Sequence, residues 1–74
     1  MAVRVDWDRQ PVSIHCNDSP PLERLIEFLR SKYNCRKHSV IMRDRENGAG
    51  YLFFVYQNLD PRWIVSFQES EVSE

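Results

Sequence analysis

The clearest hydrophobic period in the chain lies in residues 21–33. Apolar side chains recur there every three or four positions, at Leu22, Leu25, Ile26, Leu29 and Tyr33. This spacing lines one face of an α-helix. Asp18 or Ser19 is suited to cap the first turn, and Asn34 is suited to the left-handed residue that ends a helix. The pattern predicts a helix over 21–33, which needs a sheet or another helix to cover its apolar stripe.

The segments on either side alternate between apolar and polar residues, which is typical of half-buried strands. The predicted strands cover residues 2–8, 12–16, 39–45, 51–57 and 62–68. The connections between the last three are too short for crossovers and favour an antiparallel meander. The sequence therefore predicts an α+β fold in the order β-β-α-β-β-β, with a single helix packed on one face of one antiparallel-rich sheet. Ubiquitin-like β-grasp domains have the same element order.

The predicted strand at 51–57 is apolar on both of its faces. Leu52, Phe54 and Tyr56 alternate with Tyr51, Phe53 and Val55. Because one helix covers only one face of a sheet, we expect the other face to expose an apolar patch formed by Ile41, Phe53, Val55 and Ile64. Exposed patches of this kind usually mark a partner surface or a homodimer interface.

The chain has 74 residues, of which 42% are hydrophobic, so it can form one core. We expect a single domain over 1–68 and an acidic C-terminal tail over 69–74. The longest apolar run, residues 51–56, is too short to span a membrane. The N-terminus lacks the apolar region of a signal peptide, so we expect a cytoplasmic protein.

A net charge of −1 conceals an uneven distribution of charge. Residues 24–45 contain only two acids, Glu27 and Asp44, but seven basic residues: Arg24, Arg30, Lys32, Arg36, Lys37, Arg43 and Arg45. The last six residues carry three glutamates and no basic residue. Such segregation predicts a basic face and an acidic face.

The residue types that usually carry chemistry do not form a recognisable motif here. The two cysteines, Cys16 and Cys35, are expected to be reduced and buried. Together with His15 and His38 they could suggest a zinc site, but His15 and Cys16 are neighbours on a predicted strand and point to opposite faces. This geometry disfavours both zinc and Cys–His catalysis. We expect no metal, no cofactor and no enzymatic activity.

The second half of the chain resembles the small phage-encoded type I-F anti-CRISPR inhibitors. The shared positions are Ser31-Lys32, Cys35, Met42-Arg43, Asn47-Gly48, Leu52, Tyr56, Asp60 and Arg62-Trp63. The resemblance implies a protein that binds a guide-RNA surveillance complex with basic side chains at sites meant for DNA phosphates. Lys32 and Arg62 fall on such positions, whereas Glu27 stands where the family has a second helix lysine.

The leading hypothesis is a small inhibitor or adaptor that occludes a surface of a larger host complex, either protein or ribonucleoprotein. The predicted contact residues are Lys32, Arg36, Lys37, Arg43, Arg45, Arg62, Tyr51 and Phe53. Basic side chains would speed association and aromatic side chains would supply contact area. A nucleic-acid-binding domain that uses residues 24–45 is one alternative. A ubiquitin-like or dimeric adaptor is another.

Overall fold

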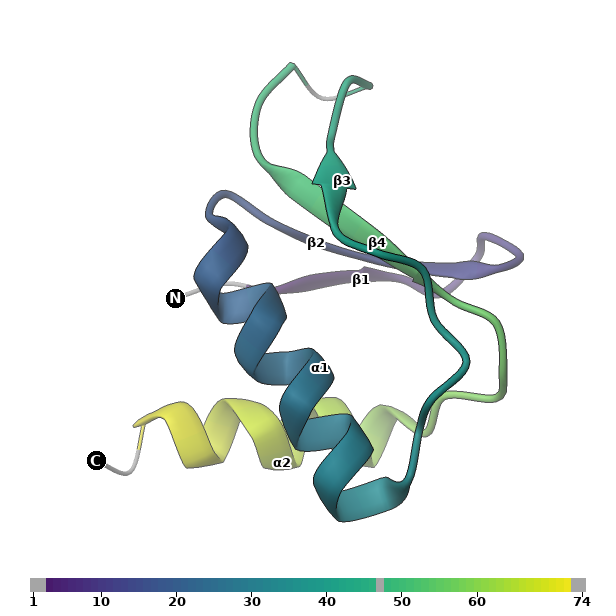
Figure 1. Cartoon of the computed structure of the whole chain (residues 1–74), viewed down its shortest axis with the longest axis vertical. Coiled ribbons are helices and arrows are strands. Elements are labelled where there is room, and N and C mark those ends of the chain that lie inside the picture. Colours follow the sequence, from purple (N-terminus) through teal and green to yellow (C-terminus); the bar gives the residue numbers. More distant parts are fainter. Residues whose placement is uncertain (1–2, 47, 73–74) are drawn as a thin grey trace.

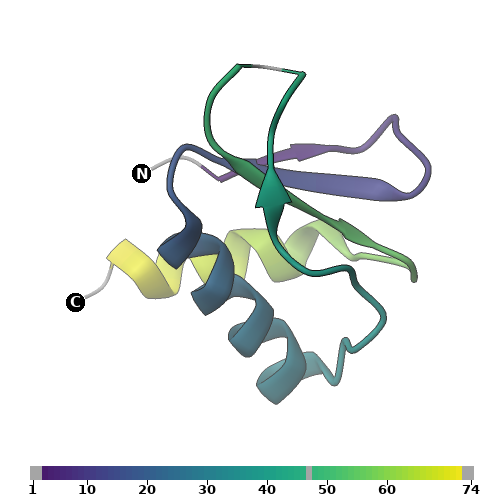
Figure 2. The ribbon, with the colours of Figure 1, turned by 45° about the horizontal axis from the view of Figure 1, so that its top comes forward.

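The computed structural model describes residues 3–46 and 48–72. Its elements are β1 (Arg4–Asp6), β2 (Val12–Cys16), α1 (Ser19–Tyr33), β3 (Met42–Arg43), β4 (Tyr51–Val55) and α2 (Pro61–Val72). The strands form one antiparallel sheet in the order β1-β2-β4-β3. Both helices lie on the same side of this sheet (Figures 1 and 2). The predicted α+β class and antiparallel sheet are confirmed, but there are two helices instead of one.

The predicted first helix is confirmed as α1, which begins two residues earlier than the hydrophobic period indicated. Its buried side chains include Leu22, Leu25 and Leu29, the stripe read from the sequence. Asn34 ends the helix in the left-handed conformation, with φ of 56°, and its N–H bonds to the carbonyl oxygen of Arg30 at 3.2 Å. The helix therefore ends where its local sequence requires.

The prediction of a strand over 62–68 is wrong, because this segment forms most of α2. Trp63, Val65 and Phe67 alternate as in a strand, but Trp63, Ile64 and Phe67 also follow the helical spacing. In the structure Ile64 and Phe67 are buried, whereas Val65 is exposed. A short segment satisfies both periods, and packing against α1 and the sheet selected the helix.

A helix-start signal precedes α2. Asp60 accepts the N–H of Arg62 at 2.9 Å through its carboxylate, as a capping residue does. Pro61 occupies the first helical position, where its missing N–H has no cost. Residues 69–72, part of the expected acidic tail, extend this helix, and Ser73 and Glu74 lie outside the described residues. No helix within 3–46 or 48–72 is long and apolar enough to cross a bilayer.

The strands differ from the prediction mainly at their ends. β2 has the predicted bounds, while the regular part of β3 shrinks to Met42–Arg43. The chain before β3 still follows β4, because Ser39 donates its N–H to the carbonyl oxygen of Phe54 at 2.8 Å. β4 pairs with β2 on one side and β3 on the other, so it is a central strand. On the second apolar face of β4, Leu52 is buried and Phe54 is half-buried.

The prediction of an exposed apolar patch on the sheet is wrong. Phe53, Val55 and Ile64 are buried, and Ile41 is half-buried. Ile14 of β2 pairs with Phe53 of β4, and both belong to the core that the two helices cover. The helices therefore pack on the face that the prediction left open. The opposite, helix-free face carries Leu52 and Phe54 of β4 together with polar residues of β2.

Candidate functional site

Three segments converge at one end of the molecule: the C-terminus of α1, the connection that follows it and the start of α2 (Figure 1). Tyr33 from α1 stacks on Trp63 from α2, with ring centroids 4.7 Å apart and planes 13° from parallel. Four of the predicted contact residues occur in these segments: Lys32, Arg36, Lys37 and Arg62. We call these four cations and the stacked Tyr33–Trp63 pair the basic end.

Three cations of the basic end form no ion pair with the acidic side chains that the structure describes. Within the part of the chain that the structure describes, Lys32, Arg36 and Lys37 are exposed and form no ion pair. Their local contacts keep the charge available: the Lys32 ammonium lies 5.4 Å from the centroid of the Phe28 ring. The Arg36 Nε donates to the side-chain oxygen of Asn34 at 2.6 Å. The result is a local excess of positive charge on a protein whose net charge is −1.

Other arginines of α1 are neutralised. Arg24 pairs with Glu71 of α2 at 2.8 Å, and Arg30 pairs with Glu27 one turn earlier at 2.8 Å. Surface pairs of this kind contribute little to stability, but they cancel charge where they form. The uncancelled positive charge of α1 is therefore confined to its C-terminal end.

Arg62 differs from the other cations of the basic end because it is held by Asp60. Its guanidinium lies 2.7 Å from the Asp60 carboxylate. The hydrogen bonds from the Arg62 side chain and backbone lower the pKa of the Asp60 carboxyl. The Arg62 side chain is nevertheless 89% exposed. It can therefore contact a partner while it supports the start of α2.

The remaining predicted contact residues lie elsewhere. Arg43 and Arg45 belong to the β3–β4 hairpin, at the opposite end of the molecule from the basic end (Figure 1). The Arg43 guanidinium lies 5.5 Å from the centroid of the half-buried Tyr51 ring. Phe53 is 0% exposed. Its side chain faces the helices, beside that of Ile14, its partner on β2. Its expected role as a surface contact is wrong.

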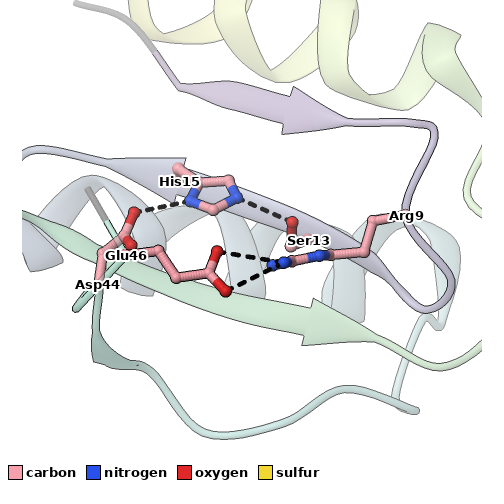
Figure 3. Close-up of polar contacts among 5 residues, drawn as sticks. All are labelled: Arg9, Ser13, His15, Asp44 and Glu46. Atoms are coloured by element: carbon pink, nitrogen blue, oxygen red, sulfur yellow. Dashed lines mark hydrogen bonds and ion pairs between the residues drawn. The ribbon is translucent and has the colours of Figure 1, made fainter.

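Sequence reasoning missed a buried polar network on the helix-free face, drawn in Figure 3. Ser13 Oγ lies 2.8 Å from His15 Nε2, and His15 Nδ1 lies 2.9 Å from Asp44 Oδ2. An imidazole that donates Nδ1–H to the carboxylate accepts the serine hydroxyl at Nε2, so all three groups are satisfied. Ser13 and His15 were detectable in sequence, since residues two apart on a strand share a face.

The position of Asp44 depends on the hairpin. Its N–H bonds to the carbonyl oxygen of Gly50 at 3.0 Å, which closes the turn after β3. Gly50 has φ of 92°, and a Cβ there would lie 2.8 Å from the carbonyl oxygen of Cys16. Only glycine permits this approach of the hairpin to the end of β2. The close approach brings Asp44 to His15, a contact that no sequence period indicates.

The order serine, histidine, aspartate is that of a hydrolase triad. A nucleophile must reach its substrate, yet Ser13 is 0% exposed. The ion pair between Arg9 and Glu46, 3.1 Å apart, is drawn beside Ser13 in Figure 3. The geometry is that of a structural connection between β2 and the hairpin, because it offers a substrate no access to Ser13 Oγ.

The described residues contain neither a cluster of metal ligands nor an exposed thiol. Among them, no group of three or more histidine, cysteine, aspartate or glutamate side chains is arranged to hold a metal ion. Cys16 and Cys35 are both buried and unbridged, as expected. Burial raises the pKa of the Cys35 thiol, which disfavours the reactive thiolate.

No protein-family model, curated protein or solved structure matches the chain. The resemblance to type I-F anti-CRISPR inhibitors therefore stays a prediction that depends on the positions named above. The function has to be argued from the surfaces of the molecule, and the basic end is the surface on which the largest number of predicted contact residues meet.

Proposed function

We propose that this protein is a non-enzymatic binding protein that docks its basic end onto a negatively charged surface of a larger assembly and so occludes that surface. The observation that carries the proposal is the group of three exposed cations without an acidic partner, Lys32, Arg36 and Lys37, beside the stacked Tyr33–Trp63 pair. An unneutralised cluster on a slightly acidic protein is suited to orient the chain toward a negatively charged partner.

In this proposal the basic side chains and the aromatic side chains contribute differently to binding. The cations accelerate encounter and reject basic surfaces, while buried aromatic and arginine side chains supply most of the binding free energy in typical interfaces. Tyr33 and Trp63 are half-buried, and their stacking fixes both rings before binding. Preorganised rings lose less conformational entropy when a partner covers them.

The family resemblance supports the same surface. Lys32 and Arg62, which fall on the basic contact positions that the resemblance implies, are thirty positions apart in sequence. They belong to the same end of the molecule because Tyr33 and Trp63, their immediate neighbours, stack on each other. A channel that binds nucleic-acid phosphates is itself basic. In such a complex, the negative charge that the basic end contacts would come from the phosphates of the bound RNA. We therefore propose a ribonucleoprotein as the partner.

A heparin column tests the basic end without knowledge of the partner. The test variant is Lys32→Glu with Arg36→Glu, and the matched control is Arg43→Glu with Arg45→Glu, which changes the net charge equally. We expect the test variant to elute at clearly lower salt than the control, because clustered cations bind a polyanion more strongly than separated ones. Equal elution of the two variants would contradict the basic end as the anion-binding surface.

A tagged pull-down from the native host, read by mass spectrometry, tests the partner. We expect the wild-type chain and the Arg43→Glu, Arg45→Glu control to capture one assembly, and the Lys32→Glu, Arg36→Glu variant to lose it while its melting temperature changes by only a few degrees. A gel-shift series with naked RNA and DNA tests the alternative of direct nucleic-acid binding. Tight binding with steep salt dependence would favour that alternative over occlusion of an assembly.

A further inference from the structure

A second surface feature lies where the β1–β2 turn approaches the connection between β4 and α2 (Figures 1 and 2). It is a groove with a volume of about 580 Å³. The buried or half-buried apolar residues that line it are Val12, Val55 and Leu59. The other lining residues are Trp7, Gln10, Pro11, Tyr56, Gln57 and Asn58.

Two large aromatic side chains of this groove are exposed, and neither stacks on another ring of the described residues. Trp7 is 41% exposed and Tyr56 is 56% exposed, although both belong to the residue types that dominate binding energetics when covered. They come from different connections, one after β1 and the other after β4. A ligand seated in the groove would therefore contact both aromatic side chains.

The polar groups of the groove are neutral, and they include several hydrogen-bond donors. None of the described residues that line it is charged. The side-chain oxygen of Gln57 accepts the N–H of Lys37 at 3.2 Å, which leaves the amide NH₂ of Gln57 to donate elsewhere. The Trp7 indole N–H can only donate, and the Tyr56 hydroxyl can also donate. A complementary ligand is uncharged and presents acceptors.

We propose that this groove binds a proline-rich peptide segment in the polyproline II conformation. Such a segment has no internal hydrogen bonds, so its carbonyl oxygens are available acceptors, and its prolines carry no N–H. Proline rings pack against aromatic side chains, which is the basis of recognition in aromatic-lined grooves. The amide oxygens of Gln10 and Asn58 can accept from sugar hydroxyls, so a neutral sugar is the alternative that the experiment has to distinguish.

This inference does not depend on the basic end. The groove contacts the connection after α1 through the backbone of Lys37, whose carbonyl oxygen accepts the N–H of Tyr56 at 2.7 Å, and through the bridge between His38 and Val55. The Lys37 side chain does not line the groove. A neutral peptide would therefore bind equally well to the wild-type chain and to the Lys32→Glu, Arg36→Glu variant. A failure of one proposal leaves the other intact.

Titration of the ¹⁵N-labelled chain with acetylated and amidated decaproline tests the proposal by two-dimensional NMR. We expect saturable shifts of the backbone amides of Tyr56, Gln57 and Asn58. Tyr56→Ala and Trp7→Ala should each weaken binding by about 10-fold or more, the usual effect of removing an aromatic anchor. Val40→Ala is the control, because Val40 is exposed but does not line the groove. Well-dispersed spectra of each variant establish that it is folded.

Three outcomes would overturn the proposal. The first is the absence of saturable shifts with decaproline. The second is an equal affinity of the wild-type chain and the folded Tyr56→Ala variant. The third is a preference for a neutral cello-oligosaccharide over the peptide, which would assign the groove to a sugar.

Discussion

The two faces of β2 bury their residues in different ways. On one face Ile14 is fully covered by the core beneath the two helices. On the other face Ser13 and His15 are also buried, although no helix covers them, and they are held by a chain of hydrogen bonds that ends at Asp44. Apolar packing is non-directional and depends on volume, whereas a buried polar chain depends on complete pairing.

This difference predicts which substitutions destabilise each face. The helix-covered face should respond mainly to lost volume and tolerate changes that conserve it. The helix-free face should respond to the loss of one partner much more than to the replacement of the whole network by apolar groups. The following changes test these expectations in order of decreasing effect.

The largest effect is expected on the helix-covered face. Phe53→Ala should lower the free energy of unfolding by about 3–5 kcal/mol, because it removes a fully buried ring and leaves a cavity. Urea unfolding measures the change. Phe53→Leu, which keeps most of the volume, should cost clearly less. A loss below about 1 kcal/mol for Phe53→Ala would mean that the core collapses around the deletion.

On the helix-free face, His15→Leu should cost about 2–3 kcal/mol, because it removes the imidazole that pairs with the buried Asp44 carboxylate. The triple variant Ser13→Ala, His15→Leu, Asp44→Leu should be less destabilised than His15→Leu alone, since it leaves no buried Asp44 carboxylate without its imidazole. Urea unfolding of both variants gives the comparison. A triple variant that is less stable than His15→Leu would show that the network contributes beyond its pairing.

A smaller effect is expected at Cys35, which is buried at the C-terminal end of α1. Because burial raises the pKa of its thiol, the folded chain holds this proton more tightly than the unfolded chain. The associated stability is present below the ordinary thiol pKa of about 8.5 and is lost as the pH rises above it. The midpoint of urea unfolding should therefore fall more steeply between neutral and alkaline pH for the wild-type chain than for Cys35→Ala. Parallel curves would contradict the shift.

The smallest effect is expected for Arg9→Gln. This change breaks the ion pair with Glu46, whose side chains are 35% and 71% exposed. Exposed pairs contribute roughly 0.2–1 kcal/mol, so urea unfolding should detect little change. A loss comparable to that of His15→Leu would show that this pair shields the Ser13–His15–Asp44 network from water. The helix-free face would then depend on an exposed ion pair as well as on its buried hydrogen bonds.

Local sequence was enough to predict the elements whose signals agree with one another. The apolar stripe of α1 and the αL residue Asn34 gave one helix, and the alternation in 12–16 gave the bounds of β2. The concentration of basic residues at the end of α1 was also visible, since Lys32, Arg36 and Lys37 are close in sequence. These features depend on residues within a few positions of each other, where periodicity and capping are informative.

Tertiary packing decided the remaining features. In residues 62–68 a strand period and a helix period competed, and burial of Ile64 and Phe67 against α1 and the sheet selected the helix. The same packing decided which face of β4 the helices cover, and so made Phe53 a core residue. The approach of Asp44 to His15 and of Trp63 to Tyr33 joins segments about thirty residues apart. Such contacts depend on how whole elements fit together, and no local pattern encodes that fit.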